Sequence, residues 1–140
     1  MYSNGSIGVA TLRRDGFAGM VADGEGEIAT KPLTFSGKHL FVNADCRFGS
    51  LAVEIADANG KVIPGFSRND CTAFVHADST KTELVFKGGD LSSLAGKTVR
   101  IRFLIKSGTL YSFWVSPSER GESRGYVAAG GPDYPGLRDI

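Results

Sequence analysis

Several residue types that would define a functional class are scarce in this sequence of 140 residues. Its 16 basic and 15 acidic side chains leave a formal net charge of only +1, so it lacks the positive excess with which proteins bind a phosphate backbone. No apolar run approaches the roughly 18 residues that a membrane-spanning helix needs. Residues 1–6 lack the charged start and apolar stretch of a secretory signal peptide. We therefore expect neither a nucleic acid nor a membrane as partner.

Cysteine and histidine are scarce as well, with two residues of each, Cys46, Cys71, His39 and His76. A zinc site needs about four such ligands at paired spacings, and these four are not paired. A disulfide between Cys46 and Cys71 would close a loop of roughly 25 residues and stabilise the fold by about 3 kcal/mol. Two buried free thiols are the alternative, and the redox compartment, which the sequence does not reveal, decides between them.

The sequence predicts no cofactor. The acidic stretch around Gly24 lacks the alternating aspartate pattern of an EF-hand loop. A structural calcium ion held by Asp23, Glu25 or Glu27 together with carbonyl groups stays open, because calcium accepts such oxygen ligands.

What the sequence has in abundance is glycine, 19 residues, together with apolar residues at every second position. This period of two predicts short strands joined by tight turns. Residues 98–106 and 109–116 alternate in this way around Ser107 and Gly108, which predicts a hairpin. Residues 51–56 and 61–63 flank an Asn-Gly turn and predict a second one.

Further strands are expected at residues 9–13, 17–22, 27–35, 38–44, 72–76 and 82–86. One helical turn is expected at residues 91–95, capped by Asp90 and ended by Gly96. No crossover helices are present, so a parallel sheet is excluded. The sequence thus predicts one all-β domain over residues 1–140, an antiparallel two-sheet β-sandwich of jelly-roll type. Its core spans about 5–116, and residues 117–140 form a loop and a Gly/Pro-rich tail.

Several phrases together resemble a known domain type. They are ATLRRDGF (10–17), TKPLTF (30–35), KHLFVNAD (38–45), GFSRNDC (65–71), LAGK (94–97) and LYSFWVS (110–116). The set resembles the C-terminal β-sandwich domain of bacterial β-propeller proteins described as family 32-like or sialidase-like glycoside hydrolases. The resemblance spans roughly residues 5–131. It implies an accessory module beside a catalytic propeller, and it transfers no ligand-contact set to this chain.

The residues themselves give little reason to expect catalysis. A glycosidase needs two facing carboxylates, but most acidic residues here lie in turns, where they organise the backbone. Asp45 and Asp70 each precede a cysteine, so a disulfide would bring them together and shift their pKa values; otherwise they only organise loops. No Gly-x-Ser-x-Gly elbow is present. We expect that the chain is not an enzyme.

Trp114, the only tryptophan, is the first candidate for ligand binding. If Tyr111 and Phe113 point into the core, Trp114 points outward, beside Arg100 and Arg102 of the predicted hairpin partner. An outward tryptophan there is either a stacking platform for a sugar ring or a cation–π contact at a domain interface. A slip of one residue in the strand, or coverage by the tail, would instead bury it.

A second group of candidates lies on the strand at 38–44 and the loop after Pro64. His39, Phe41 and Asn43, with Asp45 after them, share the face opposite the core and would suit a polyhydroxylated ligand. The alternative is a central strand covered on both faces, with Phe41 under the helical turn and His39 hydrogen-bonded. Arg68 and Asp70 either contribute to a site or only hold their loop in place.

These observations predict a non-catalytic accessory domain of a carbohydrate-active protein, which binds glycan weakly through aromatic stacking and polar contacts. The alternative is a structural domain that packs against a catalytic propeller without binding sugar. Carbohydrate or a neighbouring catalytic domain is the expected partner. The compartment is open, and it is extracellular or periplasmic if the chain belongs to a secreted hydrolase.

Overall fold

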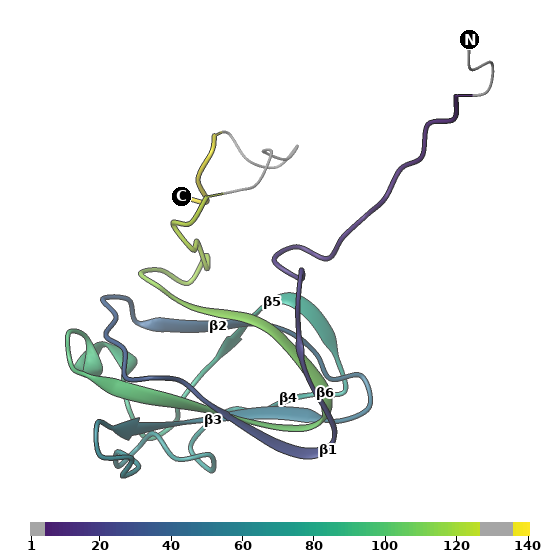
Figure 1. The fold of residues 1–140 in the computed structure, drawn as a ribbon. Coiled ribbons are helices and arrows are strands. Elements are labelled where there is room, and N and C mark those ends of the chain that lie inside the picture. The colour runs from purple at the N-terminus through teal and green to yellow at the C-terminus, as the bar shows by residue number, and fades with distance from the viewer. Residues whose placement is uncertain (1–4, 127–135) are drawn as a thin grey trace.

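The computed structural model describes residues 5–126 and 136–140, and nearly all of its regular structure is β. Six strands form one curled antiparallel sheet in the order β4-β3-β6-β2-β5, with β1 also paired to β6 (Figure 1). The elements are β1 (Met20–Ala29), β2 (His39–Asp45), β3 (Ser50–Asp57), β4 (Phe74–Val75), β5 (Asp78–Leu84), the 3₁₀ turn η1 (Leu91–Leu94) and β6 (Val99–Ser116).

Strand β6, 18 residues long, is the centre of this sheet. β3 pairs with its first part, from Asp57 opposite Val99 to Ser50 opposite Lys106. β2 pairs with its last part, from Asp45 opposite Thr109 onward. Strand β1 pairs along the opposite edge of β6 and spans both parts. β2 and β3 therefore follow one another along a single edge of β6.

Two strands and two connections between strands meet along one line, which we call the corner. It comprises residues 107–108 of β6, 46–49 between β2 and β3, 76–77 between β4 and β5, and the bulge at 22–25 in β1. The backbone nitrogen of Cys46 donates to the oxygen of Ala77 at 2.8 Å, and that of His76 donates to the oxygen of Gly49 at 3.0 Å. Bulges bend strands and increase their twist, so the bulge of β1, beside the positive φ angle of Ser107 in β6, contributes to the curl of the sheet.

Two glycines make this bend sterically feasible. A Cβ on Gly49 would lie 1.7 Å from the backbone oxygen of Lys106, and one on Gly108 would lie 2.9 Å from the sulfur of Cys46. Ser107 and His76 adopt φ angles of 44° and 48° at the same line, a region that residues with a side chain seldom occupy. The close approach of the chain segments at the corner thus requires glycine at both positions, 49 and 108.

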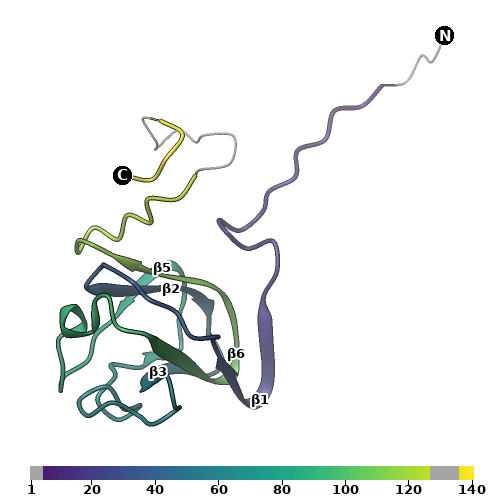
Figure 2. The ribbon, with the colours of Figure 1, turned by 60° about the vertical axis from the view of Figure 1, so that its left-hand side comes forward.

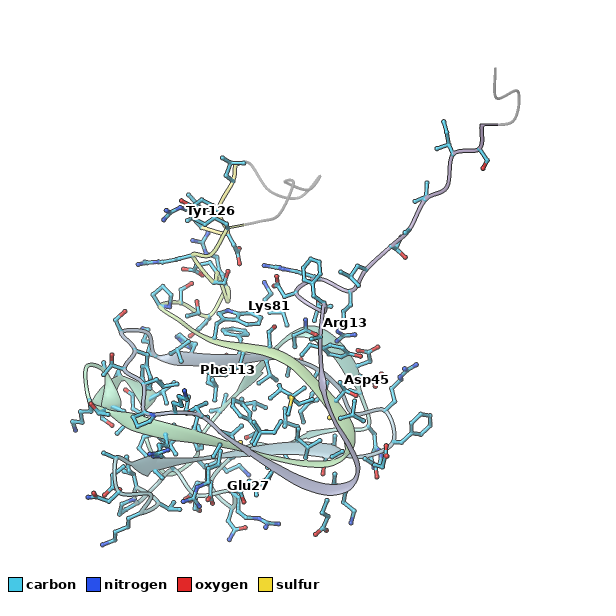
Figure 3. The ribbon with its side chains drawn as sticks, in the orientation of Figure 1. Arg13, Glu27, Asp45, Lys81, Phe113 and Tyr126 are labelled. Carbon is cyan, nitrogen blue, oxygen red and sulfur yellow. The ribbon has the colours of Figure 1, made fainter. Side chains whose placement is uncertain are left out.

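The sheet curls around one side, as the ribbon in Figure 2 shows from a second direction, and the apolar core lies on that concave side. The alternation read from the sequence is confirmed on β3 and on the first half of β6. The buried side chains there are Leu51, Val53 and Ile55 of β3 and Val99, Ile101, Phe103 and Ile105 of β6. Beyond the corner Phe113 packs against this core, pointing inward in Figure 3. Burying each such side chain contributes roughly 1.5–3 kcal/mol.

The predicted hairpin of residues 98–106 and 109–116 is wrong, because the two segments form the single strand β6. Ser107 and Gly108 were interpreted as a reversal, and they instead bend a strand that continues past them. Here tertiary pairing overrides the local turn signal, since β1 on one edge and β2 with β3 on the other bind both halves of β6 in register. The finer prediction of two sheets in a jelly roll is not confirmed.

Two local predictions are confirmed. The Asn-Gly turn after β3 closes through hydrogen bonds between Asp57 and Lys61 (2.9 Å) and between Gly60 and Asp57 (3.0 Å), with Gly60 at φ 87°. The helical turn begins at Asp90, whose carboxylate accepts from the backbone nitrogen of Ser92 at 2.8 Å. Strand boundaries elsewhere differ: the segments at 17–22 and 27–35 contribute to the one strand β1, and residues 9–13 join no strand.

Both terminal segments run over the convex side of β2 and β6 (Figures 1 and 2). Residues 13–17 lie over one part of this face, and the C-terminal loop, residues 118–125, lies over another. Residues 5–12 lead away from the body (Figure 1). Within the described ranges, no helix is long and apolar enough to cross a membrane.

The corner makes a prediction about Gly49. We expect Gly49→Ala to lower the free energy of unfolding by about 3 kcal/mol, because the new Cβ would meet the backbone of Lys106 rather than a mobile side chain. Gly24→Ala in the bulge of β1 is the control, since no atom lies within 4 Å of its Cβ position. Urea unfolding of both variants measures the difference, and equal midpoints would contradict the steric account.

Candidate functional site

Trp114 lies on the convex face, where it is half-buried rather than presented to solvent. Its ring stacks on Phe41 at a centroid distance of 5.6 Å and an interplanar angle of 14°. Its Nε1 donates to the backbone oxygen of Gly121 at 3.0 Å, and a Cβ on Gly121 would lie 2.8 Å from the Phe41 ring. Of the three alternatives, coverage by the C-terminal segment is the one observed. Phe113 packs against the core, so the strand phase that turns Trp114 outward is correct at that point; Leu110, however, is buried in the core and the Tyr111 ring lies 4.7 Å from the Arg13 guanidinium, so the predicted alternation fails at residues 110–111.

Arg100 and Arg102 do not flank Trp114, because the hairpin that would have joined them is not formed. They lie on the first half of β6, across from β3, whereas Trp114 lies across from β2. Arg102 bonds to Glu54 at 2.8 Å and to the oxygen of Gly60 at 2.6 Å. The first contact joins β6 to β3 and the second fixes the turn after β3, so the Arg102 side chain has a structural role.

The candidates of β2 share the convex face as predicted, but that face is covered. Asn43 is fully buried; it accepts from Arg13 Nε at 2.6 Å and donates to the oxygen of Arg14 at 2.5 Å. Phe41 is buried beneath Gly121 rather than beneath the helical turn. His39 Nδ1 lies 2.6 Å from the Glu83 carboxylate. Strand β2 is therefore covered on its convex face as well as on its core face.

The structure does not bring Asp45 and Asp70 together. Asp70 accepts from the backbone nitrogen of Ser67 at 3.0 Å and from its hydroxyl at 2.6 Å, and these bonds lower the pKa of its carboxyl. It organises its own loop, while Arg68 is exposed and lines a separate groove beside Lys106. A like-charge pair would raise a carboxyl pKa, which is the opposite of what both aspartates show.

Cys46 and Cys71 are both buried and carry free thiols. Burial raises the pKa of each thiol, which disfavours the reactive thiolate. Both side chains belong to the apolar core.

Two of the three acidic residues named for calcium, Glu25 and Glu27, lie near cations instead. Glu25 lies 3.6 Å from Lys106 and Glu27 lies 3.9 Å from Arg102. Over the described part of the chain, no three or more His, Cys, Asp or Glu side chains are grouped to hold a metal ion. The geometry gives the calcium site no support.

A site that sequence reasoning missed lies at the corner. A cleft of about 260 Å³ opens there between the bulge of β1 and the bend of β6. We call it the corner cleft. Its lining residues are Val21, Ala22, Asp23, Asp45, Arg47, Phe48, Ser107, Gly108 and Thr109.

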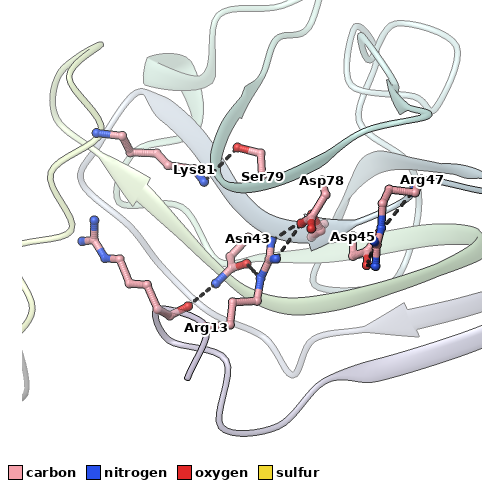
Figure 4. A network of polar contacts seen from close by, with 9 residues as sticks. Arg13, Asn43, Asp45, Arg47, Asp78, Ser79 and Lys81 are labelled. Carbon is pink, nitrogen blue, oxygen red and sulfur yellow. Dashed lines mark hydrogen bonds and ion pairs between the residues drawn. The ribbon is translucent and has the colours of Figure 1, made fainter. Parts of the chain in front are cut away.

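The corner cleft combines an exposed aromatic ring with an ion pair. Phe48 is 85% exposed. Next to it in sequence, Arg47 Nη2 lies 2.6 Å from Asp45 Oδ2 and Arg47 Nε lies 3.0 Å from Asp45 Oδ1 (Figure 4). The Arg47 side chain, hydrogen-bonded to Asp45, holds the pKa of that carboxyl below its usual value. The cleft thus offers an apolar surface, a carboxylate and a guanidinium side by side.

A second polar network, centred on Arg13, lies next to the cleft. Arg13 contacts Asp78 at 2.5 Å, Asn43 at 2.6 Å and the oxygen of Ala44 at 3.2 Å (Figure 4). Its guanidinium also lies 4.7 Å from the centre of the Tyr111 ring. One side chain thereby ties the N-terminal segment to β2 and to the start of β5, next to Asp45.

Local sequence carried only a weak signal for this site. Phe48 stands alone between two alternating stretches, where an aromatic residue is less expected than a turn residue. The adjacent Asp45 is indicated only by its neighbouring cysteine and by its place on the outward face of the strand with His39, Phe41 and Asn43. Asp23, Ser107 and Thr109 reach the cleft solely because β1 and β6 pair at the bend.

Comparisons of this chain with protein-family models, with curated proteins and with solved structures found no match.

The ion pair predicts a pH dependence. Arg47→Met should raise the pKa of Asp45 toward its usual value, because the guanidinium is the main cause of its lowering. The folded-state pKa of Asp45 lies below the unfolded one, so its contribution to stability is present above the unfolded pKa and is lost as the pH falls through the folded pKa. The stability difference between wild type and variant should therefore be largest near neutral pH and vanish in acid.

Carboxyl-carbon NMR titration of Asp45 and unfolding at several pH values measure both effects. Lys97→Met, which removes an exposed cation far along the chain, is the control and should leave the Asp45 titration unchanged. An Asp45 pKa that stays low in Arg47→Met would show that the pair is not its cause.

Proposed function

We propose that this chain is a non-catalytic accessory domain that binds glycan weakly in the corner cleft. The observation that carries the proposal is the exposed Phe48 ring beside the Asp45–Arg47 pair. Sugars present an apolar ring face and a rim of hydroxyl groups. An aromatic ring accepts the first, and charged groups fix the second through hydrogen bonds.

The charge state of the cleft supports a binding role over catalysis. A glycosidase needs one carboxyl that stays protonated to act as an acid. Asp45 has its pKa lowered instead, so it is an acceptor for sugar hydroxyls and not a proton donor. Its two oxygens are also occupied by Arg47, which fixes their direction.

The sequence phrases that resemble the C-terminal domain of propeller-type glycoside hydrolases agree with an accessory role. In that context the domain would hold substrate near a catalytic unit. A weak, shallow site fits this task, because an accessory domain adds to binding through effective concentration rather than through high affinity of its own.

A structural role is the second candidate, and a different observation favours it. Phe17, Met20 and Val21 are 80%, 58% and 69% exposed at the start of β1. Exposed apolar side chains that are neighbours in this way often mark a contact with another protein. In this alternative the domain packs against a neighbouring catalytic unit and binds no sugar.

Substitution of Phe48 tests the glycan site. We expect Phe48→Ala to weaken binding of neutral oligosaccharides about tenfold, the effect of losing one aromatic stacking contact. Phe17→Ala is the matched control, because Phe17 is equally exposed but does not line the cleft. Calorimetric titration with a panel of plant and microbial oligosaccharides measures the affinities. Absence of binding by the wild type, or equal binding by both variants, would contradict the proposal.

Trp114 provides a second test of where the site lies. We expect Trp114→Ala to leave glycan affinity unchanged and to lower the free energy of unfolding by about 2 kcal/mol, the cost of emptying a half-buried aromatic position. Thermal unfolding together with the same titrations separates the two effects. If Trp114→Ala remains folded but no longer binds glycan, the binding site lies on the convex face and not in the corner cleft.

A further inference from the structure

The charges that line the corner cleft are not balanced. Two carboxylates, those of Asp23 and Asp45, face one guanidinium, that of Arg47. Arg47 is committed to Asp45, with three nitrogen–oxygen distances of 2.6, 3.0 and 3.1 Å, so this pair carries no net charge. Among the described residues, no hydrogen bond or ion pair involves the Asp23 carboxylate. The cleft therefore has an excess of negative charge, and it lies at Asp23.

The bulge of β1 places this free carboxylate in the cleft. Ala22 pairs with Gly108 and Glu25 pairs with Lys106, so Asp23 and Gly24 both stand opposite Ser107. The Ser107 hydroxyl donates to the backbone oxygen of Asp23 at 3.3 Å. An extra residue of this kind leaves the ladder, and bulges beside binding sites re-aim a side chain. Asp23 thus lines the cleft, whereas Glu25 lines a different groove together with Lys106.

The free carboxylate and the ion pair lie on opposite sides of β6. Val21 of β1 and Asp45 of β2 both pair with Thr109. Residues directly opposite one another on antiparallel strands share a face of the sheet. These three side chains therefore form a row on the convex face. β1 and β2 are two strand spacings apart, about 10 Å, because β6 lies between them. One sugar ring can lie between the two sides.

An aromatic ring beside an unpaired carboxylate favours a positively charged group. The face of a phenylalanine ring attracts a cation, and Phe48 is 85% exposed at the cleft. A carboxylate accepts stronger hydrogen bonds from an ammonium than from a neutral hydroxyl. An anion would instead meet the uncompensated charge of Asp23. Of the groups that sugars carry, the cleft therefore suits a protonated amine best, a hydroxyl less and a carboxylate or sulfate least.

We propose that the corner cleft selects glycans that carry a protonated amino group, with the ammonium bound by Asp23 and against the Phe48 ring. This inference rests on the proposed function, because it names the class of sugar that the same cleft binds. The Asp45–Arg47 pair and the Thr109 hydroxyl contact the neutral hydroxyl groups of the sugar. An exposed ion pair and an exposed cation–π contact each strengthen binding by a few fold. Together they favour the amino sugar by roughly tenfold.

Two matched tetrasaccharides test this selectivity on the wild-type chain. One is cellotetraose, and the other is the corresponding tetrasaccharide of glucosamine, in which an amine replaces one hydroxyl of each ring. Calorimetric titration is run at about pH 5.5, where sugar amines are protonated and aspartate side chains are ordinarily ionised. We expect the glucosamine tetrasaccharide to bind roughly tenfold more tightly. The difference should shrink at high salt, because salt screens exposed charges.

A pair of charge variants locates the selectivity. Asp23→Asn should remove the preference for the amino sugar and keep the affinity for cellotetraose. Glu27→Gln is the matched control, since it removes the same charge from the same strand outside the cleft, and it should keep the preference. Both residues are exposed, and thermal unfolding verifies that both variants are folded. A lysine tripeptide, which carries ammonium groups without a sugar ring, should bind more weakly than the glucosamine tetrasaccharide.

The outcomes separate this inference from the proposed function. Equal affinity of the wild type for the two tetrasaccharides would overturn the inference and leave glycan binding intact, whereas binding of neither would overturn both. A preference that survives in Asp23→Asn, or that is lost equally in Glu27→Gln, would show that the cleft carboxylate is not its source. Tighter binding of the lysine tripeptide would assign the cleft to a protein side chain rather than to a sugar.

Discussion

The corner is the constraint on which the rest of this structure depends. Four chain segments meet along one line, and they come close enough there that Gly49 and Gly108 have no room for a side chain. Once the strands bend, one antiparallel sheet encloses its own apolar face, and no second sheet or layer of helices is needed to cover it. The same bend moves the backbone apart on the outside, where the bulge of β1 and the exposed ring of Phe48 border the cleft. The proposed site is thus a geometric consequence of how the core is closed.

The convex face of β2 and the end of β6 shows a second consequence. A sheet in which the concave side is the core leaves its other side to water unless other segments cover it. Here Arg13 and Gly121 approach that face from opposite ends of the chain and cover Asn43, Phe41 and Trp114. The aromatic stack and the buried amide hold the terminal segments against the sheet. Side chains that resemble a ligand platform in sequence are therefore structural.

Local patterns predicted the parts of this fold that local physics controls. Alternation along residues 99–105 and 51–55 identified the core face, since side chains in a strand point to opposite sides whatever the strand pairs with. The Asn-Gly turn and the cap at Asp90 were predicted because their hydrogen bonds join residues only a few positions apart. The two residues Ser107 and Gly108 carry the same turn chemistry, yet they bend a strand. Nothing near them in sequence distinguishes a bend from a reversal, because the strands that hold both halves of β6 come from residues 20–29 and 39–57.

By itself, then, the sequence determined an all-β chain, the inward face of its strands, its tight turns and the even balance of its charges. Only the tertiary structure decided which strands pair, which aromatic residue is exposed and which carboxylate meets a cation. Strand pairing joins residues distant in sequence, and its energy depends on the fit of whole surfaces rather than on the preference of any one residue. Trp114 is covered and Phe48 is exposed for this reason, although their residue types alone suggest the same role for both.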